Sequence, residues 1–192
     1  MSVQQRKERE RASRHQLIVS TARKLAEADG WEAVTTRRLA DRVEYSQPVL
    51  YSHFRGKQEI IGAVALEGFS ELADAVRRAV PVSASQRTVF VALARTYLDF
   101  AEQHPAVYDA MFSLNAGLPF ADPDTPAPLR EAFSALLEPL RPGAGRTHPA
   151  LFTEVCWAAL HGLATLTRAG RLPPEHTASR IDLLADRFLV GQ

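Results

Sequence analysis

The sequence contains a single cysteine, Cys156, among its 192 residues. One cysteine excludes an internal disulfide and a cysteine-based metal site. It lies in an apolar run, so we expect it to be a small, buried hydrophobic residue. None of the six histidines pairs with a second histidine or a carboxylate at the spacing of a familiar helical metal motif. The sequence therefore predicts no metal site and no cofactor.

Motifs that carry enzymatic chemistry are also missing. The chain has no glycine-rich phosphate loop and no Gly-x-Ser-x-Gly turn. His161 has no acid or nucleophile close to it in sequence, which favours a histidine at a helix core or helix interface over a catalytic one. The sequence thus gives little support for an enzyme.

Long apolar runs are absent from the sequence as well. The longest uncharged runs are too short to span a membrane as a helix. The first residues, Met1 to Glu8, lack the apolar segment of a secretory signal. We therefore expect a cytoplasmic protein without a membrane partner.

Runs of valine and isoleucine are few, whereas alanine and leucine are plentiful, so the composition favours an all-α fold. Residues 1–60 carry 12 Lys and Arg against 8 Asp and Glu, a balance of +4. Residues 61–192 carry 11 against 14, a balance of −3. This asymmetry fits a DNA-binding head on a neutral body. The net charge of only +1 disfavours a nonspecific architectural DNA protein, which needs a broad basic surface.

The segment from Thr35 to Lys57 is predicted to form two short helices joined by a tight turn. Thr35 or Thr36 can cap the first helix, because a threonine oxygen accepts an unpaired N–H there. Ser46 can cap the second helix, with Pro48 in its first turn. Since Pro48 cannot donate, we expect the Ser46 side-chain oxygen to accept the Val49 N–H. The apolar residues Leu39, Ala40 and Val43 share one face of the first helix.

Leu50 and Phe54 are four residues apart on the second helix, so both are predicted to point into the core. The remaining side chains of that helix are then exposed. This arrangement suits a helix-turn-helix that shows polar and aromatic groups to a DNA groove. An ordinary helical hairpin with a solvated face is the alternative that spacing alone leaves open.

The run Ser46-Gln47-Pro48-Val49-Leu50-Tyr51-Ser52-His53-Phe54, followed by Gly56-Lys57, resembles the recognition helix of the tetracycline-repressor (TetR) family. Thr35 to Ala40 resembles the first helix of that family's helix-turn-helix. The family usually has Gly-Val in the turn, where this chain has Glu44 and Tyr45. Glu44 therefore either adopts a left-handed conformation or the turn is built differently. Exposure and this resemblance together predict DNA contacts by Thr36, Gln47, Pro48, Tyr51, Ser52, His53 and Lys57.

Residues 1–12 form a charged arm, which is either a solvated segment or an arm that contacts phosphate. A capping box, Ser13-x-x-Gln16, is predicted to begin the first helix, and Gly30 to end it. Trp31 is expected to pack the junction to the next helix, without a ligand role. Further helices are expected at residues 58–79, 84–103, from Pro105 onward, 129–140, 151–168 and 175–190, with loops at 115–128 and 141–149.

The resemblance implies that a small molecule binds between the body helices. We expect an apolar pocket bounded by the helices that begin near Gln58 and Ala84 and by the helix that carries Trp157, suited to a lipophilic ligand. Ordinary core packing is the alternative for every one of these residues. The predicted lining is Phe69, Phe90, Tyr97, Tyr108, Met111 and Trp157, with His161 as a polar anchor.

The two carboxy-terminal helices are expected to pair with their copies in a homodimer, as a four-helix seam. Small residues allow a second helix to approach closely, and apolar residues surround them. The string Trp157-x-x-x-His161-Gly162 resembles a carboxy-terminal variant within the TetR family, the Trp-x-x-x-His-Gly (WHG) variant. The predicted interface consists of Ala158, Ala159, Gly162, Leu163, Leu166, Leu184 and Phe188.

Taken together, the sequence predicts an all-α protein with a helix-turn-helix DNA-binding domain at residues 1–56 and a ligand-binding and dimerisation domain at 57–192. The predicted function is a ligand-responsive transcriptional repressor, released from a palindromic double-stranded DNA operator by a small lipophilic molecule. The competing interpretation is a helical-bundle enzyme or ligand carrier with a structural amino-terminal head.

Overall fold

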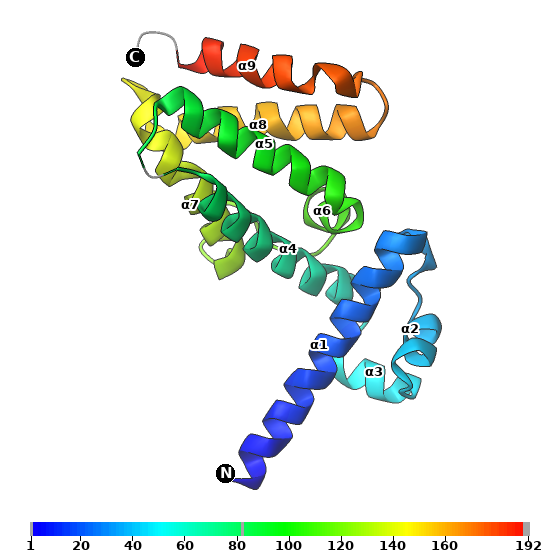
Figure 1. The fold of residues 1–192 in the computed structure, drawn as a ribbon. Coiled ribbons are helices and arrows are strands. Elements are labelled where there is room, and N and C mark those ends of the chain that lie inside the picture. Colours follow the sequence, from blue (N-terminus) through cyan, green and yellow to red (C-terminus); the bar gives the residue numbers. More distant parts are fainter. Residues whose placement is uncertain (1, 82, 190–192) are drawn as a thin grey trace. The chain divides into compact units, whose positions relative to one another are not determined.

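The computed structural model describes residues 2–81 and 83–189, which fold into helices without any strand (Figure 1). The all-α prediction is confirmed. The end predicted at Val190 for the last helix lies outside the described residues. The helices are α1 (Val3–Asp29), α2 (Thr36–Val43), α3 (Gln47–His53), α4 (Lys57–Ala79), α5 (Gln86–Gln103), α6 (Pro105–Phe112), α7 (Ala127–Leu140), α8 (Pro149–Arg168) and α9 (Thr177–Phe188), with short 3-10 turns at Trp31–Ala33, Arg141–Ala144 and Pro174–His176.

The chain divides into two compact units. The first comprises residues 1–68 and 104–126, and the second comprises 69–103 and 127–192. The first unit thus holds α1, α2, α3, the first half of α4, and α6, while the second holds the rest of α4 together with α5, α7, α8 and α9. The functional division proposed at residue 56 follows the end of the helix-turn-helix and lies within the first unit.

Helix α1 begins at Val3, so the capping box predicted at Ser13 is wrong. The capping box is at Ser2 instead, whose hydroxyl accepts the Gln5 N–H at 3.2 Å while the Gln5 side chain accepts the Ser2 N–H at 3.0 Å. The charged arm continues the helix because it is rich in arginine, glutamate and glutamine and contains no glycine or proline. Ser13 is an exposed residue inside the helix.

Within the first unit, three hydrogen bonds hold α6 against the end of α1 and the turn Trp31–Ala33 that follows it. The two carboxylate oxygens of Glu27 accept the N–H groups of Ala106 and Val107, each at 3.1 Å. These are unpaired donors of the first turn of α6, where a negative charge is also favoured by the helix dipole. Trp31 is buried, and its indole N–H donates to the Ala106 carbonyl at 2.8 Å, so the hydrogen-bond partner of its side chain lies on α6 and not on the next helix.

The second unit buries one face of each of its helices. Phe90, Leu93 and Tyr97 of α5 are fully buried, and Leu160 of α8 is buried to the same degree. Cys156 is also buried, as predicted, and burial raises the pKa of its thiol to about 12. The thiol is therefore protonated at neutral pH and unreactive.

The turn between α2 and α3 contains a residue in the left-handed region. Glu44 has φ 57° and ψ 35°, which selects the first of the two alternatives drawn from the sequence. Its N–H and that of Tyr45 both donate to the Ala40 carbonyl, and this closes α2. The conformation costs free energy for any residue with a Cβ.

Replacing Glu44 by glycine is expected to stabilise the first unit, because glycine adopts positive φ without a Cβ clash. After subtraction of the entropy that glycine loses on folding, the gain should be about 0.5–1 kcal/mol in the free energy of unfolding. Urea denaturation measures it. As a control, Arg42→Gly in the ordinary helical backbone of α2 should destabilise by about 1 kcal/mol. A loss of stability in Glu44→Gly equal to that of the control would contradict the assignment.

Candidate nucleic-acid interface

Helix α2 is capped by Thr35 and packs through its apolar face. The Thr35 hydroxyl accepts the Arg38 N–H at 3.2 Å, which places Thr36 at the first helical position, where it is half-buried. Leu39, Ala40 and Val43 are buried, as their spacing predicted. The first helix of the motif is thereby fixed against its neighbours on one side.

The start of α3 differs from the prediction at Ser46. Its side chain makes no capping hydrogen bond, and its backbone carbonyl instead accepts the N–H groups of Val49 at 3.0 Å and Leu50 at 3.2 Å. The expected bond to the Ser46 hydroxyl is therefore wrong, because a backbone turn already occupies the Val49 donor. Pro48 lies in the first turn, where its lack of an N–H costs nothing.

The two sides of α3 differ in character, as predicted. Leu50 and Phe54 are only 2% and 4% exposed. On the other side Gln47, Pro48 and Ser52 are exposed, and Tyr51 retains 51% of its surface. The helix thus shows an amide, a hydroxyl and a phenol to solvent, a set that can hydrogen-bond and pack against base edges.

His53 lies at the end of α3 and is half-buried beside α1. Its ring centroid is 6.4 Å from that of His15, and the His15 ring stacks on Phe54 at 4.5 Å. Burial lowers the pKa of His53, and the positive charges of His15, Arg11 and Arg14 lower it further. Sequence analysis did not place these three α1 residues beside α3, because the contact joins segments about 40 residues apart in the chain, which local spacing does not relate.

Lys57 opens α4 and is half-buried. Its ammonium donates to the Trp31 carbonyl at 2.5 Å, which uses one of its three N–H donors. The guanidinium of exposed Arg55 pairs with the Glu59 carboxylate at 3.6 Å, and the Arg55 backbone N–H donates to the same carboxylate at 2.8 Å. Lys57 therefore has a structural contact within the first unit in addition to its predicted role.

The predicted ligand lining is divided between the two units. Tyr108 and Met111 belong to the first unit; the Tyr108 ring lies 4.8 Å from that of Phe112, and Met111 packs over Gly68. In the second unit, the Trp157 indole N–H donates to the Tyr97 hydroxyl at 3.0 Å. The second unit also contains Phe69, Phe90 and His161.

The aromatic members of this set are packed, since each of Phe69, Phe90, Tyr97 and Tyr108 is at most 4% exposed. Trp157 and His161 are half-buried, with ring centroids 6.5 Å apart. Burial lowers the pKa of His161, so its imidazole is neutral at pH 7. A neutral ring both donates and accepts a hydrogen bond.

An open groove of about 420 Å³ lies elsewhere in the second unit, at the end of α4, the start of α5 and the end of α7. None of the predicted lining residues borders it. Its walls are Val76, Arg77, Val80, Pro81, Ala84, Gln86, Val89, Ser134, Ala135, Glu138, Pro139 and Pro142.

Helix α8 has an apolar face that its own chain leaves uncovered. Leu151, Val155 and Leu166 are 53%, 50% and 38% exposed, and they lie on the same side as Ala158 and Gly162. A Cβ added to Gly162 would meet no atom within 4 Å. The other predicted interface residues are half-buried, namely Ala159, Leu163, Leu184 and Phe188, and the Phe188 ring packs edge-on against Phe90 and Phe152.

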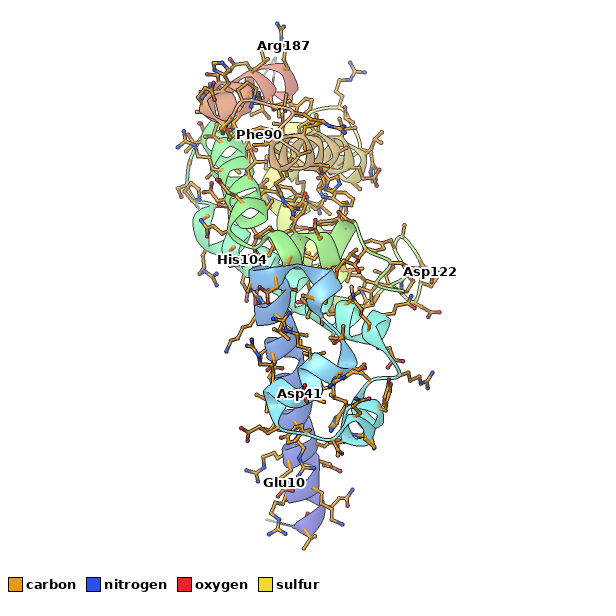
Figure 2. The ribbon with its side chains drawn as sticks, turned by 90° about the vertical axis from the view of Figure 1, so that its right-hand side faces the viewer. Glu10, Asp41, Phe90, His104, Asp122 and Arg187 are labelled. Atoms are coloured by element: carbon orange, nitrogen blue, oxygen red, sulfur yellow. The ribbon has the colours of Figure 1, made fainter. Side chains whose placement is uncertain are left out.

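Helix α8 is also long and apolar enough to cross a membrane, judged by length and composition alone. Among the residues that the structure describes, no group of three or more His, Cys, Asp or Glu side chains is placed to hold a metal ion. Figure 2 shows the side chains of both units, with Glu10, Asp41, Phe90, His104, Asp122 and Arg187 labelled.

Two family profiles match the chain. The profile described as "Bacterial regulatory proteins, tetR family" matches residues 18–64, which span the helix-turn-helix. The profile described as "Tetracyclin repressor-like, C-terminal domain" matches residues 90–190.

Two curated relatives are transcriptional regulators. YobS of Bacillus subtilis, an uncharacterized HTH-type transcriptional regulator, is 30% identical over 94 residues, which is 49% of each protein. The chain thus spans about half the length of that relative. Rv0681 of Mycobacterium tuberculosis, described in the same words, is 26% identical over 154 residues, or 80% of this chain and 69% of the relative.

Solved structures share the fold. A Rhodococcus sp. RHA1 protein of unknown function superposes with a TM-score of 0.76 at 26% identity, covering 92% of this chain and 94% of that one. A TetR variant from Acinetobacter baumannii AYE, solved in complex with minocycline, superposes with a TM-score of 0.63 at 18% identity, covering 91% and 93%.

One profile matches the amino-terminal helix-turn-helix region, and the other matches the carboxy-terminal helices. The relatives are regulators of transcription and not enzymes. The chain belongs to the tetracycline-repressor (TetR) family of bacterial transcriptional regulators.

Proposed function

We propose that this protein is a homodimeric, cytoplasmic repressor that leaves a palindromic operator when a small lipophilic molecule binds its body. The observation that carries the proposal is the presentation of α3. Leu50 and Phe54 are buried, while Gln47, Tyr51 and Ser52 are exposed on the opposite side. A helix held in this way can enter the major groove.

The proposed DNA contacts follow the geometry of α3 and its neighbours. Gln47 is the best placed for base readout, because its amide can pair with the N6 and N7 atoms of adenine. Tyr51, Pro48 and His53 would approach the same groove. We assign Thr36, Ser52 and Lys57 to backbone phosphates, which position the protein without reading sequence.

Gln47→Ala is expected to weaken operator binding by about 1–3 kcal/mol and to relax specificity at one base pair. Lys57→Ala should weaken binding to every duplex alike and flatten the dependence of log K on log salt by about one per site. Fluorescence anisotropy on operator and unrelated duplexes, over a series of salt concentrations, measures both effects.

The control for Lys57 is Lys57→Arg, because the alanine variant also loses the hydrogen bond to the Trp31 carbonyl. Arginine keeps the charge and should keep the salt slope. If Lys57→Ala leaves nonspecific affinity and its salt dependence unchanged, Lys57 does not contact phosphate.

The proposed dimer uses the uncovered face of α8 together with α9. A contiguous apolar face on a folded chain marks an interaction site, and exposed Leu151, Val155 and Leu166 form such a face. A palindromic operator has half-sites one turn of DNA apart, roughly 34–36 Å, and reading both requires two copies of α3 in a symmetric dimer. The similarity to the WHG variant, through Trp157, His161 and Gly162, is part of this proposal.

Gly162→Glu is expected to produce monomers that bind the operator poorly. Space around Gly162 is open within the single chain, so the glutamate causes no clash there and acts only by placing a charge against the partner. Sedimentation velocity gives the mass. Ser134→Glu on exposed α7 is the control with the same added charge. A wild-type protein that sediments as a monomer at micromolar concentration would remove the dimer model.

The proposed ligand site is formed within the second unit by Tyr97, Trp157 and His161, beside Phe69 and Phe90. Apolar walls with a few orienting polar groups are typical of small-molecule sites. Neutral His161 and the Trp157–Tyr97 hydrogen bond supply those polar groups. The minocycline complex of the Acinetobacter relative supports a small molecule as the inducer. Tyr108 and Met111 lie in the first unit, and their ligand contacts stay a prediction.

A screen of hydrophobic compounds by thermal shift is expected to yield ligands that also lower operator affinity about 5–150-fold, a coupling of roughly 1–3 kcal/mol. The ligand must bind the DNA-incompetent state more tightly, since equal affinity for both states shifts nothing.

Two variants locate the site. Trp157→Phe removes the indole N–H and should weaken these ligands, whereas Ala84→Trp fills the open groove and should leave them unaffected. The reverse pattern would move the site to the groove. Ligands that stabilise the protein but leave operator affinity unchanged would contradict the coupling.

A further inference from the structure

The amino-terminal part of α1 is exposed along its length, and its contacts with the first unit come near its inner end, where His15 stacks on Phe54 and the Gln16 side-chain amide donates to Glu67 at 2.8 Å. Residues 3–17 are all exposed, and burial begins only at Ile18. These turns extend past α3, and Glu10 marks them near the free end of the helix (Figures 1 and 2). A projecting helical segment of this length is marginally stable in water, so a binding partner would stabilise it.

One face of α1 changes its chemistry along its length. Ile18, Ala22 and Leu25 form the buried stripe that packs in the first unit. With helical spacing of three or four residues, the same stripe continues towards the amino terminus through His15, Arg11 and Lys7. Arg14 lies beside it. The face that is apolar where it meets the protein is therefore cationic where it meets solvent.

The opposite face of the same turns is different. There Arg6 pairs with Glu10 at 3.6 Å, so part of its charge is balanced. The basic strip, defined here as Lys7, Arg11, Arg14 and His15, is bordered by two carboxylates. Glu8 accepts the Gln4 side-chain amide at 3.2 Å, and Glu10 is the partner of Arg6. Positive charge therefore predominates on the strip.

The strip is continuous with the reading helix. His15 stacks on Phe54 at 4.5 Å and lies 6.4 Å from His53, measured between ring centroids. Arg11 precedes His15 by one helical turn and Arg14 is its neighbour in sequence, and the positive charges of both lower the pKa of His53. A duplex read by α3 would therefore pass beside this strip.

We propose that the basic strip of α1 binds backbone phosphates of the duplex next to the bases that α3 reads. The inference rests on the proposed function and extends the DNA-binding surface beyond the helix-turn-helix. Arginine suits this role because its planar guanidinium pairs with phosphate through two parallel hydrogen bonds. Phosphates would also relieve repulsion between Lys7, Arg11 and Arg14, and so order the projecting turns.

The experiment compares two double variants of the full-length protein that lose the same charge from the same helix. Lys7→Gln with Arg11→Gln removes strip residues, whereas Arg6→Gln with Arg9→Gln removes residues outside the strip. Each is titrated by fluorescence anisotropy against a fluorescein-labelled 40-bp duplex of random sequence, over a series of NaCl concentrations. Circular dichroism confirms that both variants keep the helical content of the wild type.

The strip variant is expected to flatten the slope of log K against log salt by about 1.8 per protomer, because each neutralised phosphate accounts for about 0.9 of that slope. The outer variant should change the slope by less than half as much. Equal changes of slope in the two variants, or no change in the strip variant, would contradict phosphate binding by the strip. Neither result would contradict DNA binding by the helix-turn-helix. A wild-type protein that binds no duplex at low salt would overturn the proposed function and the strip together.

Discussion

The helix-turn-helix depends on the burial of one side of the very short helix α3. Seven residues cannot form a stable helix alone, because nucleation costs more than a few hydrogen bonds return. Leu50 and Phe54 supply the missing stability by packing against the rest of the first unit, each burying a side chain worth about 1.5–3 kcal/mol. Because these residues fix the rotation of α3, they also determine that Gln47 and Tyr51 face outward. Specificity for DNA thus rests on apolar contacts that never touch DNA.

The sequence predicted the contacts that follow from short-range spacing. Leu39, Leu50 and Phe54 are buried because a helical repeat places them on one face whatever surrounds the helix. Choices between equivalent local patterns were less predictable. Ser2 and Ser13 both begin a capping box, and only the absence of a helix breaker between them decides for Ser2. Ser46 is similar, since a serine hydroxyl and a backbone carbonyl compete for one N–H, and the carbonyl accepts it.

Long-range placement is the part that periodicity does not contain. A stripe of aromatic residues on a helix predicts burial but not the neighbour against which each residue is buried. Tyr97 and Tyr108 are almost equally buried, yet Tyr97 accepts a hydrogen bond from Trp157 in the second unit, and Tyr108 packs near Phe112 in the first. The alignment of the basic strip with the buried face of α1 could not be predicted for a related reason. Lys7 and Arg11 align with Ile18 only once the helix is known to be continuous from Val3.

The two oxygens of Glu27 have a consequence for which sequences can adopt this fold. Each oxygen accepts an N–H from the first turn of α6. The side chain at position 27 must therefore carry two acceptor oxygens and be long enough for both to reach α6. Glutamine would turn an NH₂ group towards one of those donors, and aspartate is one methylene too short to reach both. Either substitution is therefore expected to leave one N–H of the first turn of α6 without its acceptor. A carboxylate that looks replaceable in the sequence is, in the folded chain, the acceptor for two N–H groups of another helix.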